Sequence, residues 1–273
     1  MNLYVQKGWP VTYEQRFILC LLFIYHIGWN VMVYALVNRS ISLFMYRFPS
    51  ADQSDTAVQL FLADLILQLS QPAFLSQHAI YFLLLIGIRV LLAPVLHAGI
   101  YNSIASSKAQ PGYRFASGVR RFSCSFAKIQ LIALLVMLCP IFVIIPLVTE
   151  HIPRINIDDF PFLKLFLWVS GLLLYTCMVK ISVMYIQFAR VSETTVRQGL
   201  CLSLRMARSI GSIAITLFII KFICVGIYFS IAYLNTGLFA HVIYLICLCV
   251  HIYFSVWTIA SHYQLWIAKR HLV

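Results

Sequence analysis

The sequence predicts an all-α membrane protein, a bundle of six transmembrane helices with amphipathic helices at the membrane interfaces. Of its 273 residues, 62% are hydrophobic and 10% are charged, whereas soluble domains are about half apolar and about a quarter charged. The apolar residues form long continuous runs instead of alternating with a period of two, which favours helices over a β-barrel. These observations exclude a soluble globular protein, a small disulfide scaffold and a disordered chain.

Six apolar runs are long enough to cross a hydrocarbon core of about 30 Å as helices. We expect them to form one membrane domain over residues 1–273. The first run should remain attached as a signal anchor, because it is too long for a signal-peptide core and no small-residue cleavage site follows it. The predicted spans are about 17–38, 79–104, 129–149, 162–189, 210–234 and 238–267.

The distribution of Lys and Arg predicts the orientation of the spans. Most of these cations lie before the first span, between spans two and three, between spans four and five, and after span six. Cytoplasmic segments are enriched in Lys and Arg, so both termini should be cytoplasmic. The net charge of +12 then reflects topology and contact with anionic lipid of the inner leaflet, not nucleic acid. We expect a multi-pass protein of the cell (cytoplasmic or inner) membrane.

The connections between spans are amphipathic. Residues 55–71 place Val58, Phe61 and Leu65 on one stripe at helical spacing, which predicts an interfacial helix on the outer surface. Residues 118–128 and 199–208 each mix cations with Phe, Leu or Met, which predicts two basic helices at the inner interface. We expect these helices to dock anionic lipid and one or more cytoplasmic protein partners through Arg120, Arg121, Lys128, Arg197, Arg205 and Arg208.

Three cations lie well inside predicted spans and are candidates for binding an anionic substrate; Lys164, at the edge of span four, is counted with the outer segments. Arg89 and Lys221 lie near the middle of spans two and five, and Lys180 lies about three-quarters of the way along span four. A charge within a bilayer costs about 2.5–3.5 kcal/mol on insertion scales, and no predicted span contains Asp or Glu. Two interpretations stay open: the side chains snorkel or are solvated within the bundle, or they bind an anion such as a lipid phosphate, a carboxylated substrate or an acidic partner residue.

Two facing histidines could hold a b-type haem: His26 and His251 lie at comparable depths, as do His97 and His262. A lone histidine in a bundle more often hydrogen-bonds a neighbouring helix, so we expect no cofactor. A metal site is not expected either, because the sequence has no HExxH motif and its eight cysteines form no CxxC pair. The cysteines are interpreted as reduced packing residues.

Several features resemble a known family. Span two contains Ala93 and Pro94 followed by small residues, Arg120–Phe122 reads RRF, span three contains Pro140 and Pro146, and a basic helix follows span four. Over about residues 75–220 this pattern resembles the six-span membrane-domain family related to the membrane region of glycerophosphodiester phosphodiesterases. The resemblance implies a bacterial cytoplasmic membrane protein that supports transport, lipid handling or complex assembly, and it transfers no catalytic residue.

The sequence contains no GxSxG elbow, Walker A loop, GxGxxG turn or cluster of intramembrane carboxylates. We therefore predict a protein that is not an enzyme: a non-catalytic membrane subunit of a multi-protein complex. It would be permease-like, moving an anionic or lipidic substrate with a partner ATPase, or an assembly scaffold. The alternatives are a stand-alone lipid-binding or lipid-moving protein and a b-type haem redox protein.

Overall fold

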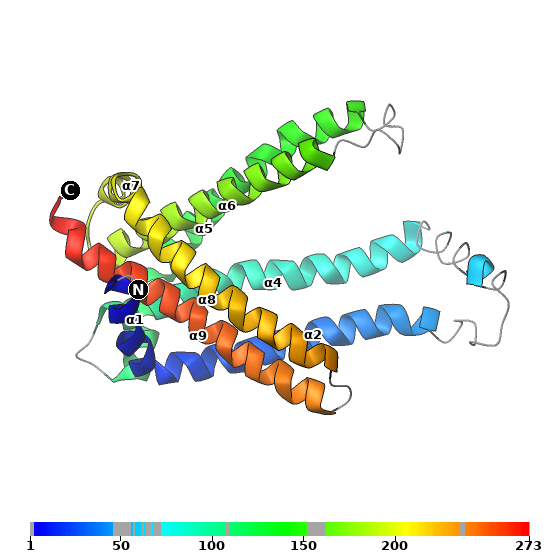
Figure 1. Ribbon diagram of the computed structural model, residues 1–273, viewed down its shortest axis with the longest axis horizontal. Coiled ribbons are helices and arrows are strands. Elements are labelled where there is room, and N and C mark those ends of the chain that lie inside the picture. Colours follow the sequence, from blue (N-terminus) through cyan, green and yellow to red (C-terminus); the bar gives the residue numbers. More distant parts are fainter. Residues whose placement is uncertain are drawn as a thin grey trace. The chain divides into compact units, whose positions relative to one another are not determined.

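A computed structural model of the chain is helical almost throughout the residues that it describes (Figure 1). Within these residues, six helices are long and apolar enough to cross a membrane. The prediction of an all-α, six-span architecture is confirmed, and the chain is a multi-pass integral membrane protein. The described residues are 3–45, 56, 58–61, 63, 67, 72–106, 110–151, 162–234 and 238–272.

The six long helices follow one another in the order of the predicted spans, and shorter helices precede, separate and follow them. The long helices are α2 (Arg16–Met45), α4 (Pro72–Ala105), α5 (Pro111–His151), α6 (Phe162–Val191), α8 (Ala207–Leu234) and α9 (Leu238–Lys269). The short ones are α1 (Leu3–Glu14), α7 (Val196–Arg205) and the 3-10 helix η3 (Arg270–Leu272).

Contacts within the chain divide it into two units. The first unit comprises Met1–Leu19 and Pro94–Val273, and the second comprises Cys20–Ala93. The second unit therefore holds most of α2 and the first part of α4. The first unit holds the remaining helices, and the candidate site described below lies within it.

The basic segment 118–128 is not a separate interfacial helix. It belongs to α5, which continues from Pro111 to His151 through the predicted span 129–149. No proline or glycine lies between Val119 and Cys139, so nothing interrupts the backbone hydrogen bonds at the predicted boundary. The expectation of an independent helix here is therefore corrected.

The second basic helix is separate, but it begins earlier than predicted. It is α7, Val196–Arg205, and not 199–208. The chain leaves α6 through a turn in which Glu193 has a φ of 58°, and Thr195 then caps the new helix. The Thr195 side chain accepts a hydrogen bond from the Gln198 amide while the Gln198 side chain accepts one from the Thr195 amide, a reciprocal capping box.

The predicted outer interfacial helix at 55–71 lies largely outside the described residues. Residues 58–61 of that segment are helical.

The core of the first unit is an aromatic cluster where the final turns of α4 meet α5, α6 and α9. The Phe188 ring lies 5.1 Å from that of Tyr101, 5.7 Å from Tyr185 and 5.3 Å from Tyr263, measured between centroids. Phe126, Phe188, Tyr185 and Trp266 are at most 1% exposed. Burial of such large rings contributes strongly to the packing at this end of the helices.

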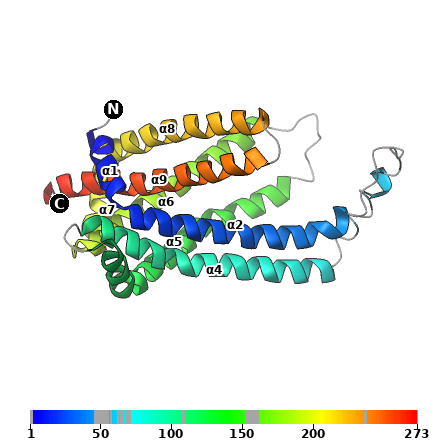
Figure 2. The same ribbon diagram turned by 90° about the horizontal axis from the view of Figure 1, so that it is seen from below.

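The short helix α1 lies against α9 in the same unit. The Trp257 indole Nε1 donates a hydrogen bond of 2.9 Å to the Val5 carbonyl, and the Trp9 ring makes edge contacts with those of Tyr253 and Trp257 at 4.9 Å. Helices α8 and α9 run side by side in both views (Figure 2). This packing fixes the segment of α9 that adjoins the site.

Candidate functional site

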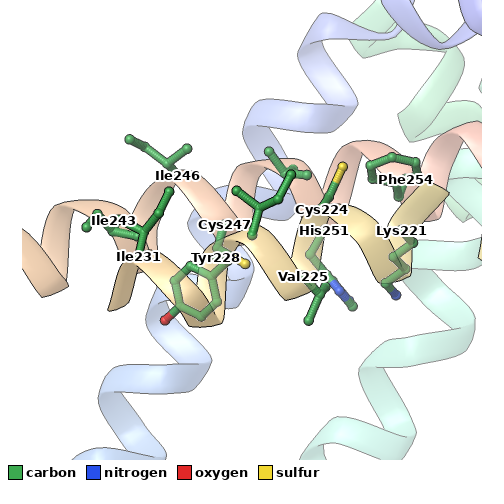
Figure 3. Close-up of a pocket in the computed structure, with 12 residues that line it drawn as sticks. Lys221, Cys224, Val225, Tyr228, Ile231, Ile243, Ile246, Cys247, His251 and Phe254 are labelled. Carbon is green, nitrogen blue, oxygen red and sulfur yellow. The ribbon is translucent and has the colours of Figure 1, made fainter. Parts of the chain in front are cut away.

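A groove of about 300 Å³ lies between α8 and α9 (Figure 3). Its lining residues extend from Lys221 to Ile231 on α8 and from Ile243 to Phe254 on α9. Two of them, Ile227 and Ile246, are 56% and 59% exposed, so the groove is open along one side. An open apolar groove on a membrane helix can receive an apolar molecule.

Helical spacing brings the lining side chains together. Lys221, Cys224, Tyr228 and Ile231 follow one another at intervals of three or four residues, which places them on one face of α8. The same spacing on α9 aligns Ile243, Cys247, His251 and Phe254. Cys224, Val225 and Cys247 have small side chains, which leave space in the groove that larger residues would fill.

Lys221 is the charged residue that borders this groove: its aliphatic stem lines the groove, and its ammonium group lies at the margin of an almost wholly apolar surface (Figure 3). Its side chain is half-buried, and α8 and α9 contain no Asp or Glu. Among the residues that the structure describes, no hydrogen bond or ion pair to the Lys221 ammonium is found within the groove. An ammonium group in a lipid-facing groove loses hydration that an anionic ligand would replace.

The polar and apolar lining residues are separated along the groove. Lys221 and His251 lie at the same end as Phe254, whereas Ile231 and Ile243 lie at the other end, with Tyr228 between them (Figure 3). In the same view the Lys221 amine and the His251 ring extend to the same side of the helix pair. The groove is therefore suited to a molecule with one polar end and one apolar end.

Arg89 lies in the second unit, and Trp29 is its neighbour there. The guanidinium carbon is 5.3 Å from the centroid of the Trp29 ring, a cation–π distance. Such contacts contribute about 0.5–1 kcal/mol at exposed sites and about 2 kcal/mol when desolvated. The structure thus gives Arg89 an aromatic neighbour, and its role in binding an anion stays a prediction.

Lys180 lies on α6 and is exposed. It does not line the groove, and Arg89 belongs to the other unit. Of the three predicted intramembrane cations, Lys221 alone contributes to the α8–α9 groove. Sequence reasoning identified Lys221 but missed Tyr228, Cys224 and Cys247, although their spacing from Lys221 and His251 is readable in the sequence.

The histidines considered for haem have different surroundings. His26 belongs to the second unit and His251 to the first, so neither unit contains this pair. His97 and His262 both lie in the first unit, where His97 contacts Tyr101 and His262 contacts Tyr185. The Tyr185 hydroxyl lies 3.4 Å from Nδ1 of His262. His262 is thus part of the aromatic core, and its Nδ1 faces a hydroxyl of the neighbouring helix α6.

The predicted docking cations are all exposed on α5, α7 and the start of α8, namely Arg120, Arg121, Lys128, Arg197, Arg205 and Arg208. Arg121 forms an ion pair with Glu193, which links α5 to the turn before α7. Both of these side chains are about two-thirds exposed, 66% and 65%, so the pair contributes at most about 1 kcal/mol.

Helix α7 presents a mixed face away from α6. Its buried side holds Gly199, where an added Cβ would lie 2.9 Å from the Tyr185 carbonyl oxygen. Leu200, Leu204 and Arg205 remain exposed on other sides. In Figure 1 α7 is seen end-on while α8 and α9 are seen from the side, so α7 runs across these spans. That orientation is typical of an interfacial helix.

No family model matches the sequence, and the comparisons with curated proteins and with solved structures likewise found no match. The resemblance over residues 75–220 therefore stays a prediction.

Proposed function

We propose that this chain is a non-catalytic integral membrane subunit that receives an anionic or lipidic substrate in its α8–α9 groove. The observation that carries the proposal is the position of Lys221 in an otherwise largely apolar, open groove. Retaining an ammonium group there costs free energy. Neutralisation by an anionic substrate offsets this cost and gives the lysine a functional role.

The exposed surface around α7 supports a partner on the predicted cytoplasmic side. It combines Arg197, Arg205 and Arg208 with Leu204, which is 75% exposed. The sequence has no nucleotide-binding loop. A permease-like subunit would therefore rely on a separate ATPase for energy, and this surface is where we place the contact; an assembly scaffold would use the same surface.

A stand-alone lipid-binding or lipid-moving protein is the second candidate. The same groove favours it, because a molecule drawn from the bilayer can enter from the open side without any partner. The two candidates differ in whether the chain works alone.

Co-purification separates them. The tagged chain is extracted from its native membranes across a series of detergent strengths, and co-eluting chains are identified by mass spectrometry. We expect an ATPase or another subunit to co-elute, and to be lost from a variant carrying Arg197→Gln and Leu204→Gln. Arg39→Gln, an exposed cation on α2, is the matched control. A chain isolated alone at every detergent strength would contradict the subunit proposal and leave the stand-alone candidate.

A further inference from the structure

We infer that the ligand of the α8–α9 groove is an anionic amphiphile with a single hydrocarbon chain. Its acidic group, a carboxylate or a phosphate, lies at Lys221 and its chain runs along the groove towards Ile231 and Ile243. This inference rests on the proposed function and specifies its substrate class.

The number of chains follows from the size of the groove. Lys221 and Ile231 are ten residues apart on α8, a distance of about 15 Å along a helix. The volume of the groove is about 300 Å³. One extended hydrocarbon chain occupies a space of this length and volume, so a diacyl lipid would have to leave its second chain outside the groove.

The direction of the chain follows from the lining. The end near Lys221 offers an ammonium group and the His251 ring, both of which can bond an acidic group. Towards the other end the lining is mostly isoleucine, namely Ile227, Ile231, Ile243 and Ile246, with the neutral Tyr228 hydroxyl directed to that end (Figure 3). A ligand in the opposite orientation would set its acid among isoleucines and its chain against the lysine, losing both interactions.

The depth of Lys221 distinguishes this ligand from an ordinary lipid of the bilayer. Lys221 follows the first residue of α8, Ala207, by 14 residues, about 21 Å of helix. The hydrocarbon core is about 30 Å thick, so an acid at Lys221 lies well below the headgroup layer. In the predicted topology the acidic end points towards the cytoplasm. The groove thus holds the amphiphile with its acidic group near the middle of the bilayer, a position part-way across the membrane.

Ligand retention tests the class. The full-length protein is delipidated in detergent, incubated with oleate, oleoyl lysophosphatidate or oleyl alcohol, and examined by native mass spectrometry. We expect wild type to retain one acidic ligand and no oleyl alcohol. Lys221→Met should lower occupancy at least about tenfold (~1.4 kcal/mol at that ratio), while Lys221→Arg keeps it. Lys180→Met, an exposed intramembrane lysine on α6, is the matched control and should bind as wild type does.

The two acidic probes identify the source of the charge. Preferential retention of oleate indicates a fatty carboxylate, and preferential retention of lysophosphatidate indicates a single-chain phosphate; either supports the inference. Retention of neither probe by wild type, equal retention by Lys221→Met, or equal retention of the alcohol would overturn it. Gel filtration of each variant confirms that the fold is intact.

A second pair of variants tests the path of the chain. Ile231→Trp fills the apolar end of the groove and should reduce binding, whereas Ile223→Trp adds the same side chain at an exposed position of α8 that does not line the groove. A fatty acid with a diazirine at its tail should label peptides near Ile231 and Ile243 after illumination. Labelling near Phe254 and Trp257 instead would overturn the orientation. These outcomes do not depend on the co-purification result. The ligand inference and the partner proposal can therefore be refuted separately.

Discussion

A single glycine sets how closely α1 approaches α9. A Cβ added at Gly8 would lie 2.3 Å from Oγ of Ser261 and 2.9 Å from its Cα and backbone nitrogen. Backbone atoms cannot move aside as a flexible side chain can, so any larger residue must displace α1 from α9. The contact also positions the Trp257 hydrogen bond to Val5.

We predict that Gly8→Ala lowers stability in detergent. Overpacking costs about 1–3 kcal/mol, which exceeds the gain of about 1 kcal/mol from replacing a helical glycine by alanine. The measurement is the thermal unfolding midpoint from tryptophan fluorescence. Gly226→Ala on α8, where nothing lies within 4 Å of the added Cβ, should be neutral or stabilising. Equal midpoints for the two variants would contradict the close contact.

The environment of His262 yields a spectroscopic prediction at the same scale. Its ring is 1% exposed and lies against Tyr185 in the aromatic core. We expect protein purified from a haem-replete host to show no Soret band, because this histidine is committed to packing. A Soret band that disappears in His262→Ala but persists in His271→Ala, an exposed histidine in η3, would contradict this and revive the haem alternative.

At the scale of single elements, α7 depends on its cap. The side chains of Thr195 and Gln198 each accept a hydrogen bond from the other's backbone amide at the start of a helix of 10 residues. An isolated helix of this length is only marginally stable. Thr195→Ala should cost about 0.5–2 kcal/mol. We expect faster hydrogen exchange of α7 amides in this variant.

Thr216→Ala is the control for the cap. The Thr216 hydroxyl donates to the Ser212 carbonyl inside α8, where the backbone ladder is complete without it. Unchanged exchange of α7 amides in Thr195→Ala would show that packing of Gly199 and Leu202 on α6 holds the helix without its cap.

These elements also show what sequence patterns can reach. The six spans follow from runs of apolar residues, and the T-x-x-Q pattern at Thr195–Gln198 would have placed the start of α7 correctly. The boundary expected at 128/129 failed because a change from basic to apolar residues alters the surroundings of a helix without breaking it. Helix α1 was missed because 12 residues are too few for a span, although Val5, Gly8 and Thr12 form its buried side at helical spacing.

The sequence predicted only part of the candidate site, because the rest depends on how helices pack against one another. Lys221 stood out because a charge within a span is costly. Cys247 and His251 line the same groove because α9 packs beside α8. The order of the helices hinted at this, since consecutive elements joined by a short connection are usually neighbours. Trp29 beside Arg89 likewise required the packing of two helices distant in sequence.

At the scale of the whole molecule, the charge distribution ties the groove to a direction across the membrane. Lys221 follows the first residue of α8 by 14 residues. The exposed cations of α7 and of the start of α8 lie at the N-terminal end of α8. If that end is cytoplasmic, the acidic end of the ligand points inward. If it were external, the same groove would hold the ligand in the reverse sense, and the proposed ATPase would have no surface to bind.

Cysteine labelling measures this direction. Cys201 is exposed on α7, and in a variant whose other cysteines are replaced by alanine it is the single target for a membrane-impermeant maleimide. Because cations favour the cytoplasmic side, we expect labelling only after the cells are permeabilised. A cysteine introduced by Ser54→Cys, in the predicted outer connection, should label in intact cells in the same background. Labelling of Cys201 in intact cells would place the basic helices outside and reverse both the partner surface and the direction inferred for the ligand, while leaving the geometry of the groove itself unchanged.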